Sequence, residues 1–150
     1  MTAAPLLTGS SVVLRPPQPT DGADRLALGN DPDIMRMFGA DPAALPPLTQ
    51  AAVAAWLDGI ATCSHAWVVE HDGRLLGGAR LHTLDWQDAR AQFAVGLYDP
   101  ARLGIGLGRE TVRLVLQHAF GELRLHRVGL RVVAYNVRAI RCYQACVNAS

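Results

Sequence analysis

The stretch that decides the fold is LYDPARLGIGLGRET, residues 97–111. Before it the apolar residues alternate as in a strand, and after it they recur with the period of an amphipathic helix. Three glycines, Gly104, Gly106 and Gly108, alternate between the two patterns. Glycine lets a ligand approach the backbone closely, and the first N–H groups of a helix have no internal partner, so such a turn suits a phosphate group. The segment predicts a strand, an anion-binding turn and a helix, although the same glycines would also fit a tight turn without a ligand.

Two well-known phosphate-binding motifs do not fit this turn. A P-loop requires Gly-Lys followed by Ser or Thr, but all 14 basic residues of the chain are arginine. The dinucleotide fingerprint GxGxxG would require glycine at position 109, where the chain has Arg109. A nucleotide-binding α/β protein is therefore disfavoured by the motifs that it lacks. Arg102 and Arg109 flank the turn and could add positive charge to an anion site.

Outward from the turn, the apolar pattern predicts an α/β (α+β) fold with a mixed, mostly antiparallel sheet flanked by helices. Asp72-Gly73 signals a tight hairpin, and Thr49 can cap a helix. The predicted strands are 12–14, 66–70, 75–84, 91–97 and 128–132, and the predicted helices are 21–28, one opening at 31–32, one after Thr49, one after the glycine turn and one after Asn136.

Length and composition favour a single domain over residues 1–150. Half of the 150 residues are apolar, which suits a chain with a real core. A net charge of +1 without a basic run argues against nucleic-acid binding, and no apolar run reaches the roughly 20 residues that span a membrane. Three cysteines, Cys63, Cys142 and Cys146, suggest reduced thiols in the cytoplasm, and no Cys/His cluster suggests a metal.

Several segments taken together resemble the GNAT-type N-acetyltransferases. Residues 99–111 look like the acetyl-CoA loop of that family, and residues 136–143, NVRAIRCY, look like its second signature, an asparagine with a tyrosine seven residues on. Residues 117–128 and 12–16 are similar to the ribosomal-protein N-terminal acetyltransferase branch. The resemblance implies an acetyl-CoA-dependent N-acetyltransferase whose acceptor is a primary amine, either a protein N-terminus or a small amine.

The resemblance also implies where acetyl-CoA would bind. Its diphosphate would lie on the backbone amides of the glycine turn, and its pantetheine arm would run along the strand before it. Gly96 inside that strand signals a β-bulge, and a split beside the strand would expose a donor for the reaction's oxyanion. Leu103 stands where the family usually has arginine or glutamine, and Arg102 is one position early. The implied cofactor-binding residues are Val95, Gly96, Leu97, Arg102, Leu103, Gly104, Ile105, Gly106, Leu107, Gly108, Arg109, Asn136 and Tyr143.

Catalysis would require an acid and a base. The resemblance implies Tyr143 as the acid that protonates the departing thiolate, and an ordinary core aromatic is the alternative reading of this residue. The branch often has a glutamate where this chain has Gln92, which cannot take a proton. His82 is the predicted base, because an unperturbed histidine titrates near 6.5, with Asp85 and Glu70 as alternatives. The other histidines are predicted to be surface residues: His65, His71, His118 and His126.

Gln92 and the short tail favour a second hypothesis, a catalytically weak acyl-CoA-binding or interaction module of the same fold. In the family, the last helix continues into Gly-Phe and further strands, whereas this chain has Val147 and Asn148 there and stops at Ser150. An uncovered sheet edge is a liability, so we expect a homodimer to cover it, unless the reading frame itself is altered or truncated.

Overall fold

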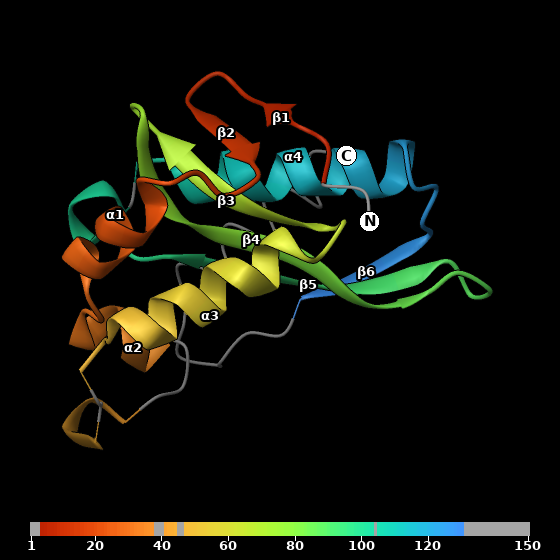
Figure 1. Cartoon of the computed structure of the whole chain (residues 1–150). Helices are drawn as coiled ribbons and strands as arrows, with labels where there is room; N and C mark the ends of the chain where they lie inside the picture. Colours follow the sequence, from red (N-terminus) through yellow and green to blue (C-terminus); the bar gives the residue numbers. More distant parts are fainter. Residues whose placement is uncertain (1–3, 38–40, 45–46, 104, 131–150) are drawn as a thin grey trace.

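The computed structural model describes residues 4–37, 41–44, 47–103 and 105–130. In this part of the chain, six strands form one sheet in the order β1-β2-β3-β4-β5-β6 (Figure 1). Neighbouring strands are antiparallel from β1 to β5, and β6 runs parallel to β5. The predicted mixed, mostly antiparallel sheet is confirmed.

The elements follow the predicted order closely. The strands are β1 (Leu7–Thr8), β2 (Val12–Arg15), β3 (Ala66–His71), β4 (Arg74–Asp85), β5 (Arg90–Leu97) and β6 (Arg127–Leu130). The helices are α1 (Asp21–Leu28), α2 (Pro32–Met37), α3 (Gln50–Ala61) and α4 (Leu107–Gly121), with short 3₁₀ turns η1 (Pro42–Ala44) and η2 (Pro100–Arg102). The helix predicted after Asn136 and the end of the strand predicted to reach residue 132 lie outside the described residues.

Local signals explain several of these boundaries. The Thr49 hydroxyl accepts a hydrogen bond from the Ala52 N–H and caps α3, as expected. Asp72 and Gly73 both have positive φ, 53° and 75°, which is the backbone of a tight primed hairpin between β3 and β4.

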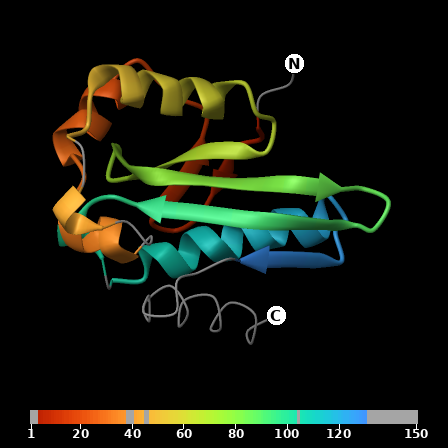
Figure 2. The same ribbon diagram turned by 90° about the horizontal axis from the view of Figure 1, so that it is seen from below.

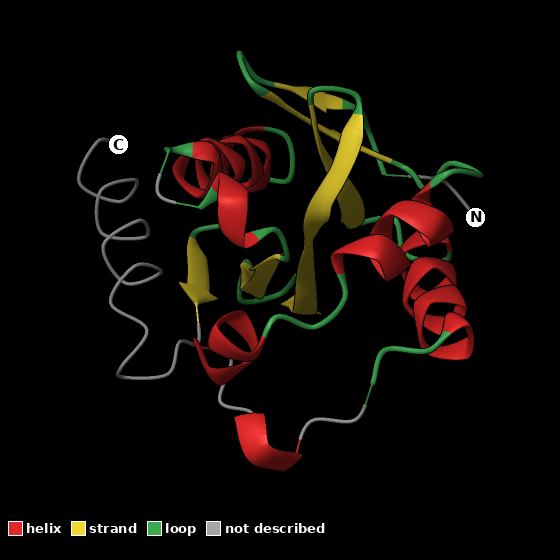
Figure 3. Cartoon of the chain, turned by 90° about the vertical axis from the view of Figure 1, so that its left-hand side faces the viewer, coloured by secondary structure: helices red, strands yellow, loops and turns green. Residues whose placement is uncertain are grey.

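Helices cover both faces of the sheet, with α4 on one side and α1 and α3 on the other (Figure 3). On the α4 side, Val115 and Ala119 of the helix pack with Leu81 and Phe93 of the strands in the main core. On the other side, a smaller cluster joins α3 to the sheet through Ile60, Val68 and Leu75. Because side chains alternate along a strand, β4 and β5 present their even-numbered residues near the middle of the sheet to the α3 side.

Strand β5 is longer than the part of β6 that the structure describes. It pairs with β6 from Arg90 to Phe93, whereas its pairing with β4 extends to Leu97 (Figure 2). No described residue pairs with the stretch 94–97 on the β6 side. Residues 94–97 form the end of β5 that leads toward the glycine turn.

Two expectations from the sequence, one at Gly96 and one at His118, need correction. The β-bulge expected at Gly96 is absent from the β4–β5 pairing, which is regular there and shifts only between His82 and Asp85. A Cβ on Gly77 would lie 1.8 Å from the carbonyl oxygen of Gly96, so close approach of the two strands accounts for the glycines here. His118, expected on the surface, is only 8% exposed, because it faces the core from α4.

Candidate active site

The glycine turn opens directly onto the start of α4. Asp99 caps the preceding 3₁₀ turn by accepting from the Ala101 N–H at 3.0 Å. Gly106 then adopts φ +90° as the N-cap of α4, a left-handed conformation that favours glycine, and no atom lies within 4 Å of where its Cβ would be. Ile105 is 63% exposed, and Leu107 is buried. The first N–H groups of this helix thus begin at an open surface.

Arg102 is held by the protein rather than extended toward solvent. Its Nε donates to the Asp99 carboxylate at 2.6 Å, and its Nη2 donates to the Leu75 carbonyl at 2.9 Å. A weaker contact joins Nη1 to the carbonyl of His71 at 3.3 Å. These bonds fasten the segment before the glycine turn to the β3–β4 hairpin. Contact of Arg102 with a cofactor stays a prediction.

Glu110 ties the first turn of α4 to the turn between β1 and β2. Its carboxylate accepts from the Ser10 hydroxyl and the Ser11 N–H, both at 2.8 Å, and from the Val12 N–H at 2.5 Å. Burial raises the pKa of Glu110, but the hydrogen bonds from Ser11, Ser10 and Val12 outweigh this effect and lower the pKa below its usual value. A cavity of about 290 Å³ beside this contact includes Gly9, Gly106, Arg109 and Arg113 in its lining.

The side chains at the end of the predicted cofactor strand are partly buried. Val95 and Leu97 pack against the core on the α4 side. Gly96 has no side chain, and it lies opposite Gly78 of β4. Of the predicted residues, Val95, Gly96 and Leu97 lie at the end of β5, and Gly106, Leu107 and Gly108 lie at the N-terminus of α4, where Leu107 is buried. Gly104, Asn136 and Tyr143 lie outside the described residues.

His82 and Gln92 are directly opposed on β4 and β5, on the α3 side of the sheet. The His82 ring Nδ1 lies 2.9 Å from the Thr83 hydroxyl. Burial lowers the pKa of His82, and the charge of Arg80 lowers it further, so the ring stays neutral at neutral pH. Gln92 is exposed, and its side-chain amide lies against Gly129 of β6, where a Cβ would come within 2.9 Å of its oxygen. A neutral imidazole and a carboxamide thus occupy opposed positions on β4 and β5, and the carboxamide also lies next to β6.

The alternative bases are engaged elsewhere. Glu70 accepts from Arg15 at 2.7 Å, and Arg15 also forms an ion pair with buried Asp21. Asp85 lies 3.8 Å from Arg90 across the β4–β5 hairpin. Asp85 does line a cavity of about 560 Å³, together with Thr83, Leu84, Trp86, Arg90, Ala91 and Gln92. This cavity connects the Gln92 side chain to the hairpin end.

Sequence reasoning missed an aromatic cluster that supports β5. The Arg25 guanidinium lies 3.8 Å from the centroid of the Tyr98 ring, and Trp56 meets the same ring edge-on at 5.9 Å. Burial raises the pKa of the Tyr98 hydroxyl. The cluster joins α1 and α3 to the residue that follows the cofactor strand. Only the aromatic residue types could have suggested it, because its members come from three separate elements.

Within the described residues, no group of three or more His, Cys, Asp and Glu side chains is arranged to hold a metal ion. None of the helices in the same ranges combines the length and the apolar character that crossing a membrane requires.

Comparison with known proteins agrees with this geometry. The acetyltransferase (GNAT) domain family matches residues 11–146. The “Probable N-acetyltransferase YjcK” of Bacillus subtilis is 36% identical over 70 residues, a match that spans 47% of this chain but only 39% of that relative.

Solved structures share the fold. A spermidine N-acetyltransferase from Vibrio cholerae, in complex with CoA and spermine, superposes with a TM-score of 0.71 at 23% identity, over 92% of this chain and 80% of that one. A GNAT-family acetyltransferase from Bacillus anthracis gives a TM-score of 0.77 at 16% identity, over 95% and 82%. The fold and the matched domain point to the same family. The chain belongs to the GNAT acetyltransferase family.

Proposed function

We propose that the chain transfers the acetyl group of acetyl-CoA to a primary amine. One observation supports this most directly: the end of β5, where no described residue pairs with 94–97 on the β6 side, leads through the glycine turn to the start of α4. A pantetheine arm could hydrogen-bond along residues 94–97 as an added strand, and a diphosphate could accept from the first N–H groups of α4. The CoA bound to the Vibrio cholerae structure supports this choice of acyl donor.

The reaction requires one proton to leave the amine and one to reach the thiolate. The neutral amine attacks the thioester carbonyl, a C–N bond forms and the C–S bond breaks, giving an acetamide and the CoA thiol. His82 takes the proton from the amine, directly or through water, because its neutral ring prevails at neutral pH. Tyr143 supplies the proton for the thiolate, a role that rests on the resemblance of residues 136–143 to the family signature.

A second candidate is an acyl-CoA-binding module with little turnover. Gln92 favours it, since a carboxamide stands where the related branch often has a carboxylate. The two are separated by titrating the chain with acetyl-CoA in a calorimeter and by measuring thiol release with a panel of amines. Binding with thiol release supports the enzyme, and binding without release from any amine supports the module. If ATP or NAD raised the melting temperature and acetyl-CoA did not, both would be wrong.

We also propose four further properties of the chain. They are a single domain over residues 1–150, membership of the ribosomal-protein N-terminal acetyltransferase branch, a cytoplasmic location and a homodimer that covers a sheet edge. Sedimentation of the purified chain tests the dimer, and a monomer at micromolar concentration would contradict it.

A further inference from the structure

Arg80 lies on the same face of β4 as His82, two residues away. In a strand, that spacing places two side chains about 7 Å apart. Arg80 stands opposite Ala94 of β5, which follows Phe93, the last residue of β5 whose pairing with β6 is described. The side chain is exposed, and its positive charge acts to lower the pKa of both His82 and Tyr98. A guanidinium thus points to the surface beside the place where the acetyl group would be transferred.

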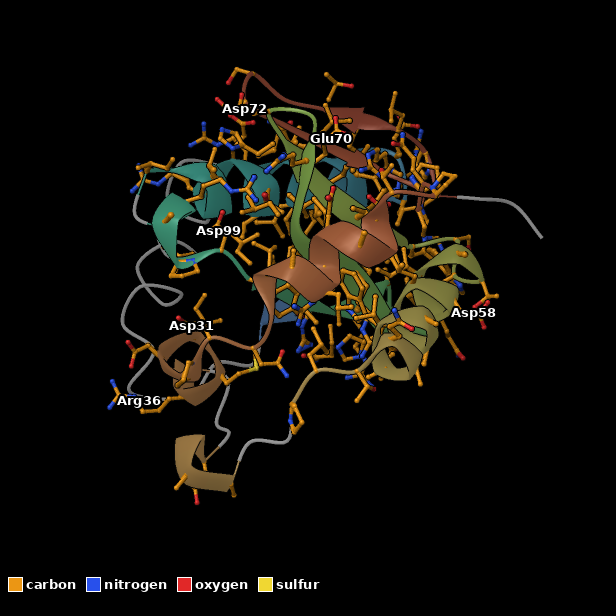
Figure 4. The ribbon with its side chains drawn as sticks, turned by 60° about the vertical axis from the view of Figure 1, so that its left-hand side comes forward. Asp31, Arg36, Asp58, Glu70, Asp72 and Asp99 are labelled. Carbon is orange, nitrogen blue, oxygen red and sulfur yellow. The ribbon has the colours of Figure 1, made fainter. Side chains whose placement is uncertain are left out.

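Among the described residues, Arg80 makes no hydrogen bond or ion pair with a carboxylate. All 13 acidic residues of the sequence fall within the described ranges, so no other Asp or Glu of this chain is available to pair with it. Three acidic side chains are already engaged with other arginines: Glu70 and Asp21 bind Arg15, and Asp85 faces Arg90. Asp58 projects from the outer side of α3 and Asp72 from the hairpin tip, away from this face (Figure 4).

The charge around His82 is therefore positive. Burial and Arg80 both disfavour its protonated form, and no carboxylate counteracts them. A polycation such as spermine would meet repulsion here, because like charges brought together without an intervening counter-charge raise the free energy of binding.

We infer that the acceptor carries a negatively charged group, a carboxylate or a phosphate, close to the amine that is acetylated, and that Arg80 pairs with this group. This inference rests on the proposed acetyl transfer at β5. Arg80 would hold the acceptor's anion while the amine reaches toward His82. The same positive charge also favours the neutral form of the amine, which is the form that attacks the thioester.

The test compares three short peptide amides that share an N-terminal alanine and continue with two aspartates, two glutamines or two arginines, with spermine as a fourth acceptor. In the wild type, kcat/KM should fall in the order acidic, neutral, basic, by up to about fivefold at each step, the effect of one exposed ion pair. Arg80→Gln should remove this order, and Arg80→Glu should reverse it. Arg74→Glu, an equal charge change at the exposed far end of β4, is the matched control and should leave the order intact.

Acetyl-CoA affinity, measured separately by calorimetry, should be the same in all four proteins. A wild-type preference for spermine or the basic peptide, or an unchanged order in Arg80→Glu, would overturn the inference while leaving acetyl transfer standing. If acetyl-CoA bound and no acceptor of any charge were acetylated, the proposed function itself would fail, and the acceptor assignment with it.

Discussion

The carboxylate of Glu110, in the first turn of α4, accepts a hydrogen bond from the backbone N–H of Ser11 at 2.8 Å. The contact joins the start of the helix to a turn 99 residues earlier in the chain. An acidic side chain in a first turn would otherwise interact with the helix's own unpaired N–H groups. Held by the β1–β2 turn, Glu110 leaves those groups available for a diphosphate.

Replacing Glu110 with glutamine should therefore weaken both folding and cofactor binding. The amide would turn a donor toward the donors of Ser10, Ser11 and Val12, and lost bonds to a charged acceptor cost about 1–3 kcal/mol. Urea denaturation should show the lower free energy of unfolding, and calorimetry should show a higher Kd for acetyl-CoA. Glu122→Gln, at the exposed end of α4, is the control. Equal acetyl-CoA affinities in the two variants would contradict the positioning role.

The same contact predicts that the free energy of unfolding decreases at acidic pH. The pKa of Glu110 is lowered in the folded state, so its contribution is complete above the unfolded value of about 4.3. It is lost as the pH falls through the lower, folded pKa. Glu110→Gln should lack this part of the acid dependence.

Gly106→Ala should weaken acetyl-CoA binding. A left-handed backbone at a residue with a Cβ costs about 1–2 kcal/mol, so the turn would shift and the first N–H groups of α4 would turn with it. Gly121→Ala, at the other end of the helix and without positive φ, should bind acetyl-CoA as the wild type does. The Kd of each variant measures the difference, and an unaltered Kd for Gly106→Ala would remove the turn from the binding site.

His82 should give the reaction an acid limb below pH 6.5. Burial and Arg80 lower the pKa of His82, so the neutral base persists at neutral pH and is lost only as the pH falls through this lowered value. The slope of the logarithm of kcat/KM against pH should then steepen by one, beyond the slope that deprotonation of the free amine itself contributes. His82→Asn should be slower and lack this limb, whereas His126→Asn, an exposed histidine, should keep it. A limb that survives in His82→Asn would place the base elsewhere.

Sequence patterns predict local structure here, but not the contacts between residues that are far apart in the chain. Helix α1 has the predicted bounds, and the hairpin at Asp72 has its predicted turn, because a few neighbouring residues determine both. The contacts of Arg102 with Leu75 and of Glu110 with Ser10 join residues 27 and 100 positions apart and have no local signature. The burial of His118 did have a local sequence signature, since positions 111, 115 and 118 fall on one side of a helix. Because histidine is a polar residue, a surface position was nevertheless expected for His118.

His118 provides a further prediction, on stability. Its ring meets Trp67 edge-on at 5.7 Å, and its Nε2 is buried without a hydrogen-bond partner among the described residues. Burial lowers the pKa of His118, and the neighbouring His65 lowers it further. The unfolded chain binds a proton near pH 6.5, whereas the folded chain does not. The free energy of unfolding is therefore fully maintained above about 6.5 and should decline as the pH falls below it.

His118→Leu should flatten this decline, because an apolar side chain of similar size has no proton to bind. Urea denaturation at pH 7.5 and 5.5 should show a smaller difference between the two pH values for the variant than for the wild type. Burial also lowers the pKa of His65, so the double variant His65→Gln/His118→Leu should be flatter still. His126→Leu serves as the control for removing an exposed histidine. If His118→Leu lost as much stability on acidification as the wild type, a different group would have to carry the proton-linked unfolding.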